Sequence, residues 1–326
     1  MRSTSASTRR HALAAMAALA GLGWAGGARA ADFPSRPIRL VVPFAAGGLT
    51  DAIARSVAEA LRGELDRPVV VENKPGASGH LGADAVAKAP PDGHTVVLLS
   101  TLHAAGRVYN ADVVRYDLFA DFVALGLLGA SPSMIVVRKD LGVQTVPQFV
   151  ALAKARPGRI SFAAVSSYLG EFFEAVADVD LNVVLYRGAA AAANDLLGDN
   201  VDAMTGTASD MSALLRSGRF VAIGVSGSAP VAEAPDARPI VESLPAYRGG
   251  QAYGLFAPAR LPAPALALWR AALAKAVQSP SYRSRLAALS MTPPDRDADA
   301  SMQDLKAATE AYALARARAA QRRPGG

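Results

Sequence analysis

A short apolar run, closed by a glycine turn and followed by an amphipathic helix, constrains the fold more than any other feature of this sequence. Residues Leu40–Val42 are apolar without alternation, which is typical of a strand buried on both faces. Pro43 ends the run, because proline has no N–H for a strand ladder. Gly47 and Gly48 then permit backbone angles that other residues resist. The helix that follows has an apolar face made of Ile53, Val57, Leu61 and Leu65.

A strand, a glycine turn and a helix N-terminus direct free N–H groups and a positive dipole end at one point. The sequence therefore predicts an anion site at this turn, and an ordinary strand-to-helix turn is the alternative interpretation. Thr50 or Asp51 is the expected helix cap, and Asp51 is also placed to pair with Arg55 one turn further on.

The same unit recurs once. Val69–Val71 is a second buried-strand candidate, a glycine-rich turn covers 76–82, and a helix continues through 87. Residues 95–99 form a third strand candidate after the strong turn at 90–93. Two such units build a parallel sheet whose turns gather at the carboxyl ends of the strands, where ligands bind.

The remaining chain also alternates between strand and helix patterns, so the fold class is α/β, and 326 residues suit two domains. Apolar runs on either side of Ser131-Pro132-Ser133 suggest one strand that leaves a first lobe and another that starts a second. Further strands are predicted at 160–165, 182–186, 201–204 and 221–225. Helices are predicted at 146–155, 189–197, 264–277 and 301–319, the last two in the first lobe.

The N-terminus is typical of an export leader. Arg9 and Arg10 precede an apolar run from Ala12 to Ala25, and Ala28-Arg29-Ala30 fits a cleavage site, so we expect the mature chain to begin at Ala31. The paired arginines suit twin-arginine (Tat) export, and Sec export remains an alternative. The run is too short for a stable membrane span.

Composition excludes several classes of protein. The absence of cysteine removes disulfides, thiolate metal sites and a lipidated N-terminal cysteine, so we expect a chain free in the periplasm, with no metal and no cofactor. Removing the leader and its four arginines leaves 30 basic and 28 acidic residues, which argues against nucleic acid. No sequence typical of a hydrolase, a phosphate-binding loop or a zinc protease is present, so an enzyme is not expected.

Five segments in register resemble the receptors of tripartite tricarboxylate transporters, the Bug family. They are Pro43–Asp51, Glu72–Gly79, Val86–Thr95, His103-Ala104 and Tyr116–Phe122, and the resemblance covers nearly the whole mature chain. It implies a two-lobed periplasmic-binding-protein type II (Venus flytrap) fold that captures a small carboxylated solute between its lobes. It also implies a monomer that is recognised by permease subunits or by a membrane sensor kinase. An exported α/β enzyme and a receptor that serves only as an interaction module are the alternatives.

On this basis we expect a leader at 1–30, a first lobe at 31–130 and 225–321, a second lobe at 131–224 and a frayed basic tail at 322–326. The expected solute contacts of the first lobe are Phe44, Ala45, Ala46, Gly47, Gly48, Thr50, Asp51, Ala77, Ser78, Gly79, Thr101 and His103. Backbone N–H groups from Ala45 to Gly48 would hold one carboxylate, and valine at Gly48 would block the turn. Gly106 stands where the family pattern has asparagine, which weakens the case for an identical site.

The second lobe departs further from the family pattern. Its expected contacts are Ser166, Ser167, Tyr168, Tyr186, Arg187 and Gly188. The loop after Ser167 is shortened, and Tyr168 is placed to close the gap. Arg187 replaces the usual lysine and would clamp a carboxylate with two parallel bonds, although a solvated arginine is the alternative. Met204-Thr205-Gly206 stands where an acidic contact is common, so that contact is absent.

Overall fold

The structure is a computed structural model that describes residues 33–109, 111–165, 167–186, 189–227, 231–247, 249–294 and 296–322. Within these ranges, only the backbone is described at Ser167, Tyr168, Ser209, Ala319 and Arg322. The predicted leader, most of the predicted basic tail, and the predicted site residues Ser166, Arg187 and Gly188 lie outside the described residues.

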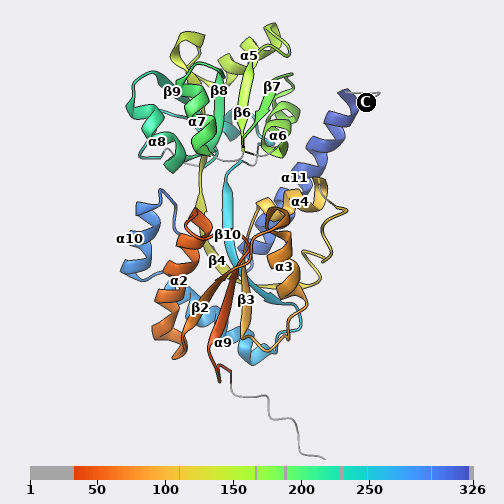
Figure 1. Cartoon of the computed structure of the whole chain (residues 1–326), viewed down its shortest axis with the longest axis vertical. Coiled ribbons are helices and arrows are strands. Elements are labelled where there is room, and N and C mark those ends of the chain that lie inside the picture. The colour runs from red at the N-terminus through yellow and green to blue at the C-terminus, as the bar shows by residue number, and fades with distance from the viewer. Residues whose placement is uncertain are drawn as a thin grey trace, which may run out of the picture.

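The described chain forms two lobes (Figure 1), and each lobe is built on a sheet of five strands. The first sheet has the order β2-β1-β3-β10-β4 and the second has the order β7-β6-β8-β5-β9. The strands of the first sheet are β1 (Ile38–Val42), β2 (Val69–Asn73), β3 (Thr95–Ser100), β4 (Phe122–Ser131) and β10 (Gln251–Pro258). Those of the second are β5 (Ser133–Arg138), β6 (Ser161–Ala164), β7 (Asn182–Leu185), β8 (Ala203–Thr207) and β9 (Phe220–Val225). The apolar runs in the sequence thus correctly predicted strands, but Val69–Val71 is not buried as predicted, because β2 lies at the edge of its sheet and Val70 is 54% exposed.

The strand registers show which sheet edges face each other. β4 ends at Ser131, and the chain passes Pro132 and enters the second sheet as β5. Ser131 pairs with the first residue of β10, which runs antiparallel to β3, so the carboxyl ends of β3 and its parallel neighbours β1 and β2 face the second lobe. Ser133, the first residue of β5, pairs with the last residue of β8. The carboxyl ends of β8, β6 and β7, which are parallel, therefore face the first lobe.

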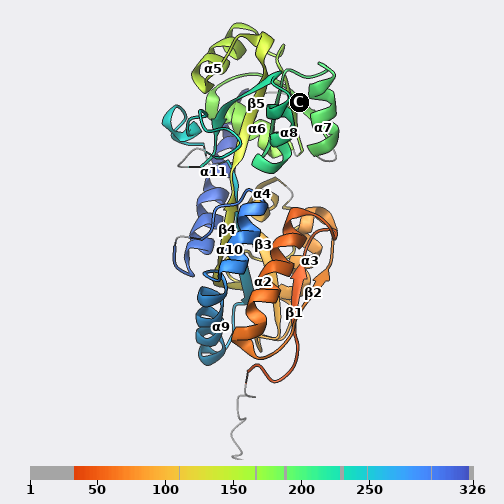
Figure 2. The ribbon, with the colours of Figure 1, turned by 90° about the vertical axis from the view of Figure 1, so that its left-hand side faces the viewer.

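Helices cover both faces of each sheet. The helices are α2 (Leu49–Leu65), α3 (His80–Ala87), α4 (Leu102–Tyr109), α5 (Val146–Ala155), α6 (Ser167–Ala177), α7 (Ala189–Leu197), α8 (Ala208–Arg216), α9 (Ala263–Ala276), α10 (Pro280–Ala288) and α11 (Ala300–Arg322). Short 3₁₀ turns are η2 (Ala77–Gly79), η3 (Lys139–Leu141) and η4 (Ile240–Glu242). On the first sheet, α2, α9 and α10 share one apolar core, and α3, α4 and α11 lie over the other face. In Figure 2, α2, α3, α9 and α10 lie around the lower lobe, and α5 to α8 lie around the upper one.

The last helix, α11, is not confined to the first lobe as predicted. It begins against β4 and β10, packs along α4, and ends against α6 of the second lobe, as its path in Figure 1 shows. The Tyr312 ring lies 6.4 Å from that of Tyr109 in α4 and 5.2 Å from that of Phe172 in α6. Arg318 also donates to the carbonyl of Ala175 in α6 at 3.3 Å. Helical periodicity predicted that α11 exists, but only contacts distant in sequence determine where it ends.

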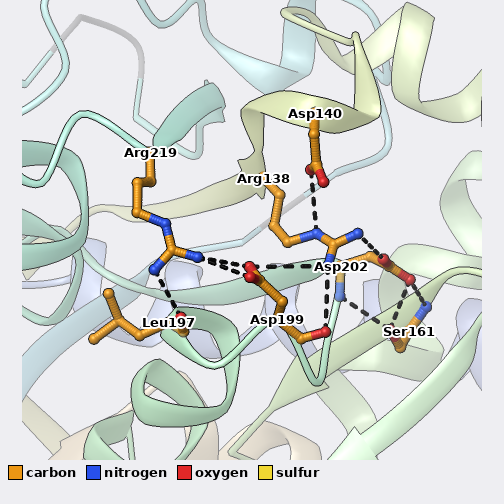
Figure 3. A network of polar contacts seen from close by, with 7 residues as sticks. All are labelled: Arg138, Asp140, Ser161, Leu197, Asp199, Asp202 and Arg219. Carbon is orange, nitrogen blue, oxygen red and sulfur yellow. Dashed lines mark hydrogen bonds and ion pairs between the residues drawn. The ribbon is translucent and has the colours of Figure 1, made fainter.

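An ionic network fixes the end of the second lobe that lies away from the first (Figure 3). Arg138, at the end of β5, contacts Asp202 at 3.2 Å, and Asp202 accepts from both the N–H and the hydroxyl of Ser161 at the start of β6. Arg219 donates to both oxygens of Asp199 at 2.8 and 2.9 Å. Because several charged groups share these contacts, this network ties the loop between α7 and β8 to its neighbouring strands.

Candidate functional site

The first glycine turn lies on the edge of the first sheet that faces the second lobe. Residues 45–48 are exposed between the buried end of β1 and the start of α2. Gly47 has a φ of +86°, a left-handed angle that favours glycine, and a Cβ there would have no heavy atom of the described residues within 4 Å. The turn therefore presents its backbone to solvent at the N-terminus of a 17-residue helix.

Two sequence predictions about this turn are wrong. Gly48 has a φ of −85°, which any residue adopts, so its substitution by valine would not block the backbone angles. The N-cap of α2 is Gly48 itself, without a side-chain cap bond, and neither Thr50 nor Asp51 occupies that position. The sequence could not show which of the two glycines has the left-handed angle, because glycine permits that angle at either position.

Asp51 is the centre of the polar contacts beneath the turn. Its carboxylate accepts from the N–H of Gly47 at 3.0 Å, from Nε of Arg55 at 2.9 Å and from Nδ2 of Asn73 at 2.9 Å. The hydrogen bond from Arg55 lowers the pKa of Asp51 to about 2; burial opposes this shift, and the bonds from Gly47 and Asn73 support it. The predicted pairing with Arg55 is confirmed.

Asn73 is a residue that the sequence reasoning missed. It is the last residue of β2, and its Nδ2 also donates to the carbonyl of Phe44 at 3.1 Å. One amide thus joins the end of the second strand to the turn after the first. An asparagine at the carboxyl end of a strand, next to a glycine-rich turn, was the available signal.

The second turn is unusual in its backbone. Four successive residues have positive φ: Gly76 at 137°, Ala77 at 47°, Ser78 at 55° and Gly79 at 95°. Left-handed angles at residues other than glycine cost about 1–3 kcal/mol each and often occur at ligand sites. Ala77 and Ser78 are both exposed, so this strained segment lies at the same sheet edge as the first turn.

His103 lies beneath both turns. It is 1% exposed, its ring is T-shaped to that of Phe44 at 5.9 Å, and a Cβ on Gly79 would lie 3.0 Å from its Nε2. Its Nδ1 contacts the N–H of Ser100 at 3.2 Å, and its Nε2 has no hydrogen-bond partner among the described residues. Burial, followed by the neighbouring His80, lowers the pKa of His103 to about 3, so the imidazole is neutral. In this form His103 supports the turns from below.

The neighbouring His80 explains the glycine at position 106. Nδ1 of His80 lies 2.8 Å from the hydroxyl of Tyr116, and burial lowers the pKa of His80. A Cβ on Gly106 would lie 1.7 Å from Nε2 of His80. The imidazole therefore fills the space that a side chain at Gly106 would need.

In the second lobe, Tyr186 is the predicted site residue whose side-chain contacts are described. The hydroxyl of Tyr186 donates to Asp195 at 2.6 Å, and burial together with this bond raises the pKa of Tyr186 to about 12. Ser167 begins α6, and Tyr168 follows it in the same helix. The positions of Ser167, Tyr168 and Tyr186 just after β6 and β7 place them on the edge that faces the first lobe.

Two cavities lie away from the glycine turns. One of about 550 Å³ adjoins the crossing between the lobes, and Thr101 is the predicted site residue in its lining. The other, of about 880 Å³, lies between α5, α6 and α11. Neither is lined by residues 44–51 or 77–79.

Within the described ranges, no group of three or more histidine, aspartate or glutamate side chains could hold a metal ion. No helix of the described chain is long and apolar enough to cross a membrane. The chemistry that the site offers is therefore hydrogen bonding from backbone N–H groups at a helix N-terminus, with a buried carboxylate that orders the turn.

Comparison with known proteins gives consistent matches. A family model described as "Tripartite tricarboxylate transporter family receptor" matches residues 53–313. A UPF0065 protein in the tcbD-tcbE intergenic region of Pseudomonas sp. strain P51 is 35% identical over 255 residues, which is 76% of each chain. Protein BugT of Bordetella pertussis is 30% identical over 268 residues, 80% of this chain and 82% of its own.

Solved structures agree with these matches. A TctC solute-binding protein from Polaromonas has a TM-score of 0.77 at 28% identity and covers 87% of this chain and 99% of its own. MatC from Rhodopseudomonas palustris, with bound malate, has a TM-score of 0.70 at 28% identity over 87% of this chain and 99% of its own. An R. palustris protein with adipate has a TM-score of 0.72 at 25% identity over 88% of this chain and 98% of its own.

Proposed function

The chain belongs to the tripartite tricarboxylate transporter receptor family, and on that basis we propose that it captures a small carboxylated solute between its two lobes. Members of this family bind solutes and do not convert them, so the chain is a binding protein and not an enzyme. The malate and adipate bound by two structural relatives support a carboxylate as the ligand.

The observation that carries this proposal is the exposed turn at residues 45–48. It combines a glycine in the left-handed region with the N-terminus of α2, and the strained second turn lies at the same sheet edge. The N–H of Gly47 is already bound to Asp51, so a carboxylate would be held by the other N–H groups of this turn and of the first helical turn. Because Asp51 is 4% exposed and paired with Arg55, its charge opposes the ligand less than a free carboxylate would.

We assign the mature protein to the periplasm as a monomer that presents its solute-bound form to permease subunits. A sensor kinase ectodomain is the alternative partner. The two facing sheet edges suit a receptor whose lobes close on the solute. A solute that binds the closed state more tightly shifts the protein towards that state, and the partner then recognises it.

The function is tested by thermal-shift and calorimetric screening of purified protein lacking residues 1–30. The panel should contain aliphatic and aromatic carboxylates, amino acids, and the methyl ester of each acid that stabilises the protein. We expect a carboxylate to raise the melting temperature and its ester to have no effect. Equal stabilisation by acid and ester would contradict an anion site.

A pair of glycine variants tests whether the carboxylate binds at the first glycine turn. Gly47→Ala should weaken carboxylate binding at least about tenfold, because the turn would leave its left-handed angle and lose charge-assisted bonds. Gly142→Ala is the matched control, since Gly142 also has a positive φ of 70° and open space around it but lies in the second lobe after η3. Equal affinity in the two variants would place the ligand elsewhere.

A further inference from the structure

The segment between β9 and β10 packs on the second lobe. The N–H of Val225, the last residue of β9, donates to the carbonyl of Arg238 at 3.0 Å. Ala234 and Ala237 are buried in an apolar cluster whose strands and helices all belong to the second lobe. Glu233, next to Ala234, is therefore attached to that lobe, and it is half-buried there.

The segment after α10 belongs to the first lobe. Met291 is buried in the apolar core that α2, α9 and α10 share. Thr292 forms two backbone hydrogen bonds with Ala130 of β4, at 2.9 and 3.0 Å. Ser290 precedes these residues with a φ of +53°, an angle that residues with a Cβ avoid unless their surroundings hold it. These contacts fix the position of Ser290 on the first lobe.

One hydrogen bond joins these two segments across the boundary between the lobes. The hydroxyl of Ser290 donates to Oε1 of Glu233, and we call this hydrogen bond the latch. In Figure 1, α10 and the upper part of α11 lie on opposite sides of β10. The latch, which follows α10, and the contact of Tyr312 in α11 with Phe172 thus tie the lobes together on both sides of the strand crossings.

A rotation of one lobe on the other would break the latch. Thr292 pairs with Ala130, which is next to Ser131 at the end of β4, so the latch lies close to the crossing from β4 to β5. Ser290 is two residues from Thr292, or about 7 Å along an extended chain. A rotation of about 15° about the crossing, a size known for rigid bodies in other proteins, would move Glu233 by about 2 Å at that distance. The hydrogen bond does not survive such a displacement, because its two atoms must lie within about 3.2 Å of each other.

We propose that the latch holds the lobes in the arrangement of this structure, in which residues 45–48 of the first turn are exposed, and that closure on the solute breaks it. The proposal rests on the proposed function, because it requires that the lobes close on a solute. An empty receptor that stays latched does not present its closed form to a partner. The apparent affinity for the solute equals the intrinsic affinity multiplied by the fraction of molecules able to close, so loss of the latch raises it.

Distances between the lobes test the latch without a solute. The sequence has no cysteine, so spin labels at the exposed positions Glu59→Cys on α2 and Asn194→Cys on α7 report one distance between the lobes in protein lacking residues 1–30. By double electron–electron resonance, Ser290→Ala and Glu233→Ala should each raise the fraction of shorter distances about twofold or more. The double variant should go no further, because all three variants lack the same bond. An unchanged distribution in both single variants overturns the proposal, and so does an additive shift in the double variant.

Affinity provides the second measurement, with adipate and malate as the carboxylate probes. In calorimetry, Ser290→Ala and Glu233→Ala should bind a probe about threefold or more tightly than the wild type does. Ser281→Ala is the matched control, since Ser281 lies on α10 and its hydroxyl contacts that of Ser279 in the same lobe at 3.3 Å. Unchanged or weaker binding in the two variants, or the same gain in Ser281→Ala, overturns the proposal. If neither probe binds the wild type, the proposed function fails for both acids, and the distances still decide whether the latch holds the lobes.

Discussion

Replacing Asp51 by alanine tests whether one buried carboxylate orders the anion turn. The change removes the acceptor of three hydrogen bonds, from Gly47 N, Arg55 Nε and Asn73 Nδ2, all between 2.9 and 3.0 Å. Asn73 keeps its bond to the carbonyl of Phe44, but Gly47 and Arg55 lose these bonds. We therefore expect the turn to loosen and the first lobe to lose stability.

The magnitude follows from the pKa of Asp51. In the folded protein this pKa is about 2, against an ordinary value of 3.8, and each unit corresponds to about 1.4 kcal/mol. A carboxyl group whose pKa is depressed by folding stabilises the protein above its unfolded pKa and loses that contribution as the pH falls through the folded value. Asp51 should thus contribute about 2–3 kcal/mol to the free energy of unfolding at pH 7, and roughly half of this at pH 3.

Urea denaturation of the wild type and of Asp51→Ala at pH 7 and pH 3 measures both values. Arg55→Ala is the comparison, because Arg55 is the largest cause of the lowered pKa of Asp51: it should remove part of the same contribution, about 1 kcal/mol, and leave the bonds from Gly47 and Asn73 in place. Asp51→Ala should also weaken carboxylate binding more than Arg55→Ala does. The reasoning is refuted if Asp51→Ala changes the free energy of unfolding by less than about 0.5 kcal/mol at pH 7, or if its effect is the same at both pH values.

Two further predictions concern the buried histidines. Gly106→Ala should destabilise the protein by about 1–3 kcal/mol, because the new methyl group would overlap the imidazole of His80. Adding His80→Ala should restore much of the lost stability, as measured by thermal unfolding. The free energy of unfolding should also fall as the pH drops from about 6.5 towards 3, because His103 stays neutral in the folded protein and binds a proton in the unfolded chain. In denaturation curves at several pH values, His103→Phe should reduce the dependence of the free energy of unfolding on pH, by at most about 1.4 kcal/mol per pH unit.

The sheets could be predicted from the sequence because local pattern determines a buried strand. The run Leu40–Val42 and the strand ending at Ser131 are apolar, bounded by proline, and both form strands. The position of the first turn followed in the same way, since glycines mark it. The sequence did not predict which of the two glycines has the left-handed angle, because glycine permits that angle at either position.

Features that depend on contacts distant in sequence escaped prediction. The fit of His80 against Gly106 joins α3 to α4, and the bond from Asn73 to Phe44 joins the ends of two strands. The left-handed angles of Ala77 and Ser78 also contradict their residue preferences, so only the surrounding structure maintains them. The conformational preferences of neighbouring residues do not predict these contacts between distant parts of the chain.

The course of α11 has a mechanical consequence. If only the strand crossings joined the two lobes, one lobe could rotate on the other about those crossings. A contact between the lobes that lies away from this axis resists the rotation. The ring of Tyr312, held between Tyr109 and Phe172, is such an attachment. Rotation of one lobe on the other must therefore slide Phe172 across Tyr312 or flex the helix. The stiffness of the molecule is thus set in part by an aromatic contact near the end of the chain, on a helix that contributes none of the glycine turns or strand ends assigned to the solute.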